Sequence, residues 1–298
     1  MMKGNSVLLF FIDGLGIGER GEYNPLSLIP NVEPLAHFRN ETPEILRGGI
    51  FVPTDPRMGI EGRPQSASGQ TTILTGINIP QTLGYHKQGF PNEAMRRIIK
   101  ESSVFLQLRK LGIEPNTFAN TYTPQFFETA PRWKSATTCA VEAAELRFNK
   151  LPDLLGGFSL FHDFTNRSLI ERGFDVPEFS PAEAGAILAN ISAKHRFTLY
   201  EHFITDKIGH DQDSERAKKH LPCLVEMIRV LLDKVDLENT TVILTSDHGN
   251  IEDLSVRQHT LNDVPTILWG KNRREAAKDI ITLSDITPAI IKLLQNVH

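Results

Sequence analysis

The sequence predicts an α/β protein in which a mostly parallel sheet has helices on both faces. Short runs rich in β-branched and aromatic residues alternate with segments of helical periodicity along most of the chain. This alternation is typical of parallel sheets whose strands are connected by helices. The run Val7–Ile12 is apolar without interruption, as expected for a strand that is buried on both faces of a parallel sheet.

Each predicted element follows from its local pattern. Val104–Leu111 has helical spacing and ends at Gly112, a plausible cap. Ser180 and Pro181 mark the start of another helix, because proline is favoured at the first helical position. The predicted strands are Val7–Ile12, Thr117–Asn120, Phe197–Ile204, Thr240–Thr245 and Val264–Leu268. The predicted helices are Ser66–Thr75, Val104–Leu111, Ala136–Phe148, Pro181–His195, Ser214–Val235 and a last one capped by Ser284.

The length of 298 residues suits one large α/β domain, so we predict a single domain over residues 1–298. The stretch from about 121 to 180 is less regular and contains several prolines with aromatic residues between them. We expect this stretch to leave the core as a small cap-like segment that covers one end of the sheet. A set of long loops is the alternative.

Charge and cysteine content exclude several classes of function. The net charge of −4 gives no reason to expect a nucleic-acid partner. No stretch approaches the length of a membrane span, and Val7–Ile12 is too short for the core of a signal peptide. Cys139 and Cys223 form no metal or redox spacing. We therefore expect a cytoplasmic protein with reduced thiols, and the sequence does not indicate its oligomeric state.

Three strand-like runs are each followed by an aspartate. VLLFFI precedes Asp13, FTLYEHFIT precedes Asp206, and TVILTS precedes Asp247. A single aspartate after a strand means little, because aspartate favours turns. In open parallel sheets, however, ligands bind beyond the carboxyl ends of the strands. If the three runs share one sheet, their carboxylates converge at one edge.

Histidines accompany two of these aspartates. His210 follows Asp206 by four residues, a spacing that can place both on one face of a helical turn. His248 follows Asp247 directly, and His259 lies in the nearby Q-H-T. Three aspartates and three histidines suffice for two divalent ions, with ligands suited to Zn²⁺ or Mn²⁺. The histidines without such neighbours are interpreted as structural: His37, His162, His195, His202, His220 and His298.

A nucleophile for such a site is offered by R-P-Q-S-A-S-G-Q-T-T, in which Ser66 could start a helix. Free backbone N–H groups and the helix dipole favour a phosphate at that position. Paired metal ions typically clamp the oxygens of a phosphoryl transfer, and a metal ion at the Ser66 hydroxyl would activate it. The alternative is that Ser66 is only an N-cap.

The stretch FFIDGLGIGERG allows a competing interpretation, because Gly16, Gly18 and Gly21 match the G-x-G-x-x-G fingerprint of dinucleotide-dependent oxidoreductases. That motif needs a helix directly after the glycines. Here E-Y-N-P-L-S-L-I-P follows, with two prolines and no amphipathic period. We therefore regard Asp13 as the functional residue of this stretch, a metal ligand at the end of the first strand.

Taken together, these motifs resemble the alkaline phosphatase superfamily, in its metalloenzyme branch with cofactor-independent phosphoglycerate mutase and phosphopentomutase. The matching pieces are F-I-D-G-L-G, P-Q-S-A-S-G-Q, D-K-I-G-H, T-S-D-H-G-N-I-E-D and Q-H-T-L-N-D-V-P. The resemblance implies an alkaline-phosphatase-like three-layer sandwich and a covalent phosphoserine at Ser66. It also implies one metal ion held by Asp13, Ser66, Asp247 and His248, and a second held by Asp206, His210 and His259.

The chain departs from the mutases of this family at Gln70, where they typically have histidine, and it lacks their longer insertion after the nucleophile. We therefore predict a phosphatase or phosphoesterase that acts on a small phosphorylated metabolite. An intramolecular phosphomutase and a non-catalytic metal-dependent binding protein are the alternatives. Predicted substrate contacts near the motifs are Arg63, His86, Lys207, Asn250 and Arg257, with weaker grounds for Asp163 and Asn166.

Overall fold

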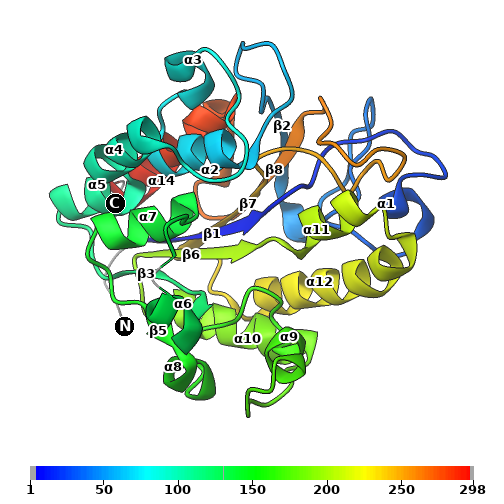
Figure 1. The fold of residues 1–298 in the computed structure, drawn as a ribbon. Coiled ribbons are helices and arrows are strands. Elements are labelled where there is room, and N and C mark those ends of the chain that lie inside the picture. Colours follow the sequence, from blue (N-terminus) through cyan, green and yellow to red (C-terminus); the bar gives the residue numbers. More distant parts are fainter. Residues whose placement is uncertain (1–4, 130, 296–298) are drawn as a thin grey trace.

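A six-stranded sheet forms the middle layer of the computed structural model, which describes residues 5–129 and 131–295 (Figure 1). His298, one of the histidines interpreted as structural from the sequence, lies outside the described residues. The strand order across the sheet is β2-β8-β7-β1-β6-β3. The strands are β1 (Ser6–Ile12), β2 (Ile50–Thr54), β3 (Asn116–Phe118), β6 (Phe197–His202), β7 (Thr240–Thr245) and β8 (Val264–Gly270).

The central strands are parallel, as predicted. β1 lies between β6 and β7 and is parallel to both, with Phe10 opposite Tyr200 on one side and Leu244 on the other. At one edge, β8 is antiparallel to β7 and to β2. Strand β2 was not among the predicted strands, because its apolar pattern is interrupted by Pro53. Proline is tolerated there because β2 is an edge strand.

Helices cover both faces of this sheet. Alternate side chains of β1 point to opposite faces, so that Leu9 and Phe11 join one apolar cluster while Phe10 and Ile12 join the other. One face is covered mainly by α2 (Ser66–Thr75), α4 (Glu93–Ser102), α5 (Val104–Lys110), α7 (Ala136–Ala143) and α14 (Ile286–Gln295). The other is covered mainly by α1 (Pro25–Leu28), α10 (Pro181–Ser192) and α12 (Ser214–Lys234). The chain is therefore a three-layer α/β sandwich.

No helix in the described part of the chain is long and apolar enough to cross a membrane.

Short elements complete the fold. The remaining strands are β4 (Thr121–Tyr122) and β5 (Asn149–Lys150), which pair with each other. The remaining α-helices are α3 (Ile79–Leu83), α6 (Pro124–Thr129), α8 (Leu151–Leu155), α9 (Arg167–Glu171), α11 (Ile204–Asp211) and α13 (Arg273–Lys278), and the 3₁₀ helices are Leu46–Gly48 and Leu283–Asp285.

Several predicted boundaries were wrong for local reasons. Helix α7 ends at Ala143, five residues before the predicted end, close to Glu145, which has a left-handed φ of 50°. The cap of the C-terminal helical segment is Thr282, whose side chain accepts a hydrogen bond from the Ser284 N–H. The predicted start of a helix at Ser180 and Pro181 is confirmed, since Ser180 and Glu183 form a capping box at the start of α10.

The segment from 121 to 180 divides between two environments. Helix α7 packs into the main core through Ala136, Ala140 and Val141. The rest includes the small β4–β5 sheet, and a separate apolar cluster forms around Leu154 and Phe161. In Figure 1, α6, α8 and α9 lie in the green region below the central sheet. Whether this region acts as a cap stays a prediction.

Candidate metal centre and active site

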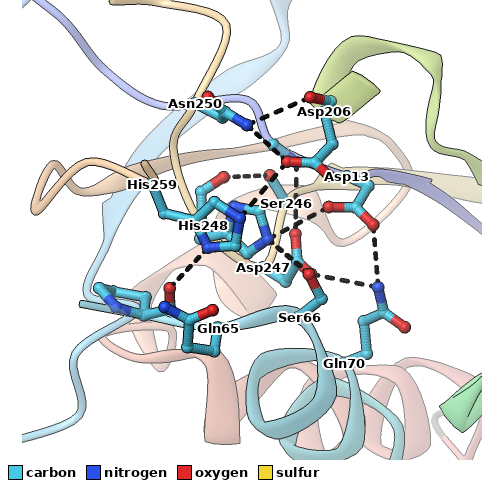
Figure 2. A network of polar contacts seen from close by, with 12 residues as sticks. Asp13, Gln65, Ser66, Gln70, Asp206, Ser246, Asp247, His248, Asn250 and His259 are labelled. Atoms are coloured by element: carbon cyan, nitrogen blue, oxygen red, sulfur yellow. Dashed lines mark hydrogen bonds and ion pairs between the residues drawn. The ribbon is translucent and has the colours of Figure 1, made fainter. Parts of the chain in front are cut away.

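Four side chains predicted to share one ion converge where β1 and β7 end (Figure 2). Nε2 of His248 lies 2.9 Å from Oγ of Ser66, 3.2 Å from Oδ1 of Asp13 and 3.5 Å from Oδ2 of Asp247. Ligand atoms around a tetrahedral zinc ion, each at about 2.0–2.2 Å, lie roughly 3.3 Å from one another. The group therefore has the spacing that one divalent ion requires.

A second group joins Asp206 with two histidines. Nε2 of His210 lies 3.4 Å from Oδ2 of Asp206 and 3.2 Å from Nε2 of His259, which lies 3.6 Å from Oδ1 of Asp206. Both histidines donate from Nδ1 to backbone carbonyls, His210 to Arg257 and His259 to Pro64. In the neutral rings, these bonds leave two Nε2 lone pairs facing each other. A cation between them removes that repulsion.

The two groups adjoin each other at His248. Its ring stacks on that of His259, with 3.5 Å between ring centroids and 12° between ring planes. Candidate ligand atoms of Asp13, Asp247 and His248 lie within 4.8 Å of one another, and so do those of Asp206, His248 and His259. The side chains present therefore fit two neighbouring cations.

The electrostatics of the site also call for cations. Burial raises the pKa of Asp13 well above its usual value, and the charge of Asp206 adds to this. Burial and the charge of Asp13 likewise raise the pKa of Asp247. Burial acts in the same direction on Asp206, but hydrogen bonds and charges from His210, His248 and Asn250 outweigh it and bring its pKa to about 2. Among the described residues, only histidines form ion pairs with these carboxylates.

Close backbone contacts bring the candidate metal ligands together. Gly14 follows Asp13 with a φ of 76°, and a Cβ at this position would lie 2.9 Å from Cα of Asp206. A Cβ on Gly69 of α2 would lie 2.9 Å from Cβ and from the carbonyl oxygen of Asp247. Only glycine permits both approaches without a shift of the backbone, so these positions decide how close the ligands come.

The hydroxyl of Ser66 is not used as a helix cap. Ser66 is the first residue of α2, and the N-cap position belongs to Gln65. Oγ of Ser66 instead hydrogen-bonds to His248. The first N–H groups of a helix have no carbonyl partner within the helix and favour an anion. The N-cap alternative for Ser66 is therefore wrong, and its hydroxyl faces the candidate metal centre.

Two supporting residues were not found by sequence reasoning. The side-chain amide of Gln70 donates to Oδ2 of both Asp13 and Asp247, at 3.0 and 3.2 Å. The buried carboxylate of Glu252 accepts four hydrogen bonds and joins the loop after β1 to the loop that bears the histidines. Glu252 lies within the motif T-S-D-H-G-N-I-E-D, and this position was the only feature of the sequence that could have indicated its role.

The predicted substrate contacts occupy different environments. Asn250 is fully buried, and its amide donates to the backbone and side-chain oxygens of Asp206. Asn250 thus holds a carboxylate in place, and its contact with substrate stays a prediction. Arg63 donates to the carbonyl of His259, and Lys207 is exposed with its ammonium group 4.7 Å from the Phe203 ring centroid.

The other two contacts lie on loops. Nε2 of His86 lies 3.2 Å from the carbonyl oxygen of Ile60, and burial lowers the His86 pKa. The guanidinium group of Arg257 donates to Gln212. Neither of these hydrogen bonds tests a contact with substrate, so the roles of His86 and Arg257 in substrate binding stay predictions.

The weaker predictions for Asp163 and Asn166 were wrong. The carboxylate of Asp163 accepts hydrogen bonds from the backbone N–H groups of Asn166 and Ser168 and from the Ser168 hydroxyl. The Asn166 amide donates to the carbonyl of Pro177. These contacts organise the start of α9, and Asp163 lines a cleft of about 760 Å³ that includes none of the candidate metal ligands.

The glycine fingerprint has no structural counterpart. The helix after Gly21 is α1, which begins at Pro25 and has only four residues. Gly18 instead forms a parallel bridge with Phe38. A dinucleotide site would need a longer helix that starts at the glycines.

The fold is similar to that of alkaline phosphatases, and the site offers ligand groups for divalent cations. The family model of the Metalloenzyme superfamily matches residues 177–296 of this chain. The 2,3-bisphosphoglycerate-independent phosphoglycerate mutase of Mycoplasmoides gallisepticum is 30% identical over 152 residues, which are 47% of this chain and 30% of that protein. The enzyme of the same name from Clostridium kluyveri is 34% identical over 96 residues, 30% of this chain and 19% of that protein. The chain thus spans less than a third of these relatives' lengths.

Solved structures agree with this fold. The PH0037 protein from Pyrococcus horikoshii aligns over 99% of this chain and 98% of its own, with a TM-score of 0.57 and 16% identity. A cold-active alkaline phosphatase from Shewanella sp. aligns over 98% of this chain and 100% of its own, with a TM-score of 0.54 and 10% identity. The fold expected from the resemblance is therefore confirmed.

Proposed function

We propose that this protein is a two-metal phosphoryl-transfer enzyme, a phosphatase or phosphoesterase that forms a phosphoserine at Ser66. The proposal depends mainly on one observation: the Ser66 hydroxyl lies at the N-terminus of α2, 2.9 Å from His248 and beside buried carboxylates that no lysine or arginine of the described residues neutralises. A phosphate ester placed there would meet the helix N–H groups and the metal centre together.

The residues divide between two ions as the family resemblance implies. Ions at these positions would lower the pKa of a nearby hydroxyl or water and offset the charge of the phosphate oxygens. The oxygen and imidazole donors suit Mn²⁺ or Zn²⁺. One ion would be held by Asp13, Ser66, Asp247 and His248, and the other by Asp206, His210 and His259.

The reaction would proceed in two displacements at phosphorus. Oγ of Ser66 loses its proton to solvent and bonds to phosphorus, while the ester P–O bond breaks and the alcohol leaves with a proton from solvent. Water then attacks the phosphoserine, the Oγ–P bond breaks, and Ser66 recovers a proton as inorganic phosphate departs. Arg63, His86, Lys207 and Arg257 are the candidate contacts to the substrate, of which the arginines and the lysine can pair with phosphate oxygens.

The first test compares wild type with Ser66→Ala, using protein loaded with Mn²⁺ or Zn²⁺ and p-nitrophenyl phosphate. We expect Ser66→Ala to lose turnover while it keeps its Tm, and acid-quenched wild type to contain phosphoserine. Ser255→Ala, at an exposed position, is the control and should retain turnover. Full turnover in Ser66→Ala would exclude Ser66 as the nucleophile. A chelator should abolish activity, and added metal should restore it.

A phosphomutase is the second candidate, favoured by the similarity to phosphoglycerate mutases. It would move phosphate within one molecule and release little inorganic phosphate. Phosphorus NMR of reactions with sugar phosphates and phosphoglycerates separates the two activities. Tight binding of phosphate esters without turnover on a broad panel would instead indicate a metal-dependent binding protein.

A further inference from the structure

A second cavity lies at the same end of the sheet as the metal centre, beyond β3 and β6. Its volume is about 210 Å³, below the usual range for drug-sized ligands, so that it suits one part of a small metabolite. Glu201 of β6 lines the cavity and lies opposite Phe11, two residues before Asp13. Thr137, which donates to Glu201, and Gln70, which donates to Asp13, line the same small space beside Phe11. The cavity and the metal centre are therefore neighbours.

A chain of hydroxyl groups in the wall of the cavity ends at Glu201. Thr137 donates to Oε2 of the Glu201 carboxylate at 2.7 Å. The Thr137 proton is then used, so Ser135 must donate to Thr137. By the same reasoning Thr138 donates to Ser135, and Tyr122 donates to Thr138. All four hydroxyl protons are therefore directed along the chain toward the carboxylate.

The cavity consequently offers acceptors and lacks cations. Burial raises the pKa of Glu201 to about 7. Above that pH the carboxylate is ionised, and its Oε1 accepts no hydrogen bond from the described residues. Nδ1 of His162, which also lines the cavity, is buried, has no partner among the described residues and can accept a hydrogen bond when the ring carries its proton on Nε2. No lysine or arginine is among the lining residues, whereas aromatic side chains such as Phe161 and Phe203 are. A carboxylate or a second phosphate would find no counter-charge here, but a hydrogen-bond donor would find an open acceptor.

From this arrangement we infer that the cavity holds the alcohol part of the substrate and selects phosphate esters whose alcohol carries hydroxyl or ammonium donors. The inference rests on the proposed function, because it assumes that the phosphate lies at the metal centre. Hydroxyl groups of a polyol would donate to Glu201, and aromatic walls would contact its C–H faces. An ammonium group would use the same carboxylate together with the faces of the aromatic rings.

The decisive variant is Glu201→Gln, with Glu44→Gln at an exposed position as the matched control. The glutamine carbonyl can still accept from Thr137, while its NH₂ group turns the open acceptor into a donor. Affinities are measured by calorimetry on metal-loaded protein with Ser66→Ala in the background, so that the result does not depend on turnover. The ligands are glycerol phosphate, phosphoethanolamine, phosphoglycolate and phenyl phosphate.

We expect Glu201→Gln to weaken binding of glycerol phosphate or phosphoethanolamine about tenfold relative to phenyl phosphate, and to improve the relative affinity for phosphoglycolate. The stronger of the first two ligands shows whether hydroxyl or ammonium donors are preferred. Equal loss for all four ligands would overturn the inference, because it would indicate a structural role for Glu201. A change in bound metal per chain would also overturn it, since Glu201 would then be a metal ligand. If wild type turns over no ester but the binding pattern holds, the proposed function fails and the cavity assignment stands.

Discussion

Replacing Glu252 by glutamine should destabilise the protein more than a typical substitution does. Oε1 accepts hydrogen bonds from the Thr260 hydroxyl and the Asn262 amide, and Oε2 accepts them from the backbone N–H groups of Gly16 and Asn250. In Glu252→Gln, one of these oxygens becomes an NH₂ group. With the NH₂ group at Oε2, both backbone donors lose their acceptor. With the NH₂ group at Oε1, the Thr260 hydroxyl can turn and accept, and the bond from Asn262 is lost. One or two hydrogen bonds are therefore lost inside a site that is 2% exposed.

The expected magnitude follows from these contacts. A hydrogen bond to a charged group contributes about 1.5–3 kcal/mol, so the loss of one or two should lower the free energy of unfolding by about 1.5–6 kcal/mol. This is a large share of the 5–15 kcal/mol typical of folded domains. At about 2–4 °C per kcal/mol for chains of roughly this size, Tm should fall by about 3 °C or more.

Urea unfolding followed by circular dichroism measures this effect, with a chelator present so that metal affinity does not contribute. The control is Glu238→Gln, because Glu238 is exposed and its carboxylate forms no hydrogen bond or ion pair with other described residues. The control should stay within about 0.5 kcal/mol of wild type. If Glu252→Gln also stays within 1 kcal/mol of wild type, the network around this carboxylate does not stabilise the site as we describe.

Three further predictions concern the metal centre. Gln70→Leu should weaken metal binding about 10- to 100-fold in a calorimetric titration, because the amide that orients Asp13 and Asp247 is lost. Unchanged metal affinity would contradict this role of Gln70. The control is Gln81→Leu, at an exposed position. In metal-free protein, the hydrogen bond from His210 to Asp206 raises the His210 pKa from 6.5 to about 9. This bond therefore stabilises the folded protein fully below about pH 6.5, and the stabilisation is lost as pH rises through 9. Tm should fall over that range in wild type and less in His210→Gln, and equal slopes would refute the assignment. Gly69→Ala should cost about 1–3 kcal/mol of unfolding free energy, because its Cβ would lie 2.9 Å from Asp247; wild-type stability in urea would show that α2 can move away.

Sequence patterns were sufficient for the central strands and for most candidate ligands. Uninterrupted apolar runs identify β1 because strands of a parallel sheet are buried on both faces. Adjacent parallel strands end at the same edge, so Asp13 and Asp247 could be expected to meet before any geometry was known. Pro53 hid the antiparallel edge strand β2, which contributes no candidate ligand.

The position of Asp206 shows where local pattern was insufficient. The expected strand stops at His202, and Asp206 lies in the first turn of α11. A run of β-branched and aromatic residues does not reveal this change, because Ile204 and Thr205 are compatible with either element. The backbone of Phe203, with φ −123° and ψ 9°, leaves the extended conformation and starts the helix.

The sequence by itself determined which residue types meet at the carboxyl edge of the sheet, because strand periodicity and motif spacing are local properties of the chain. Only the tertiary structure decided which side chains hold those residues in place. Gln70 is 57 residues from Asp13 and 177 from Asp247, and Asn250 lies 44 residues from the aspartate that it supports. Contacts over such separations depend on how helices pack onto the sheet, which no short pattern encodes. The same applies to Glu201, whose hydroxyl chain becomes visible only when α7 lies against β6.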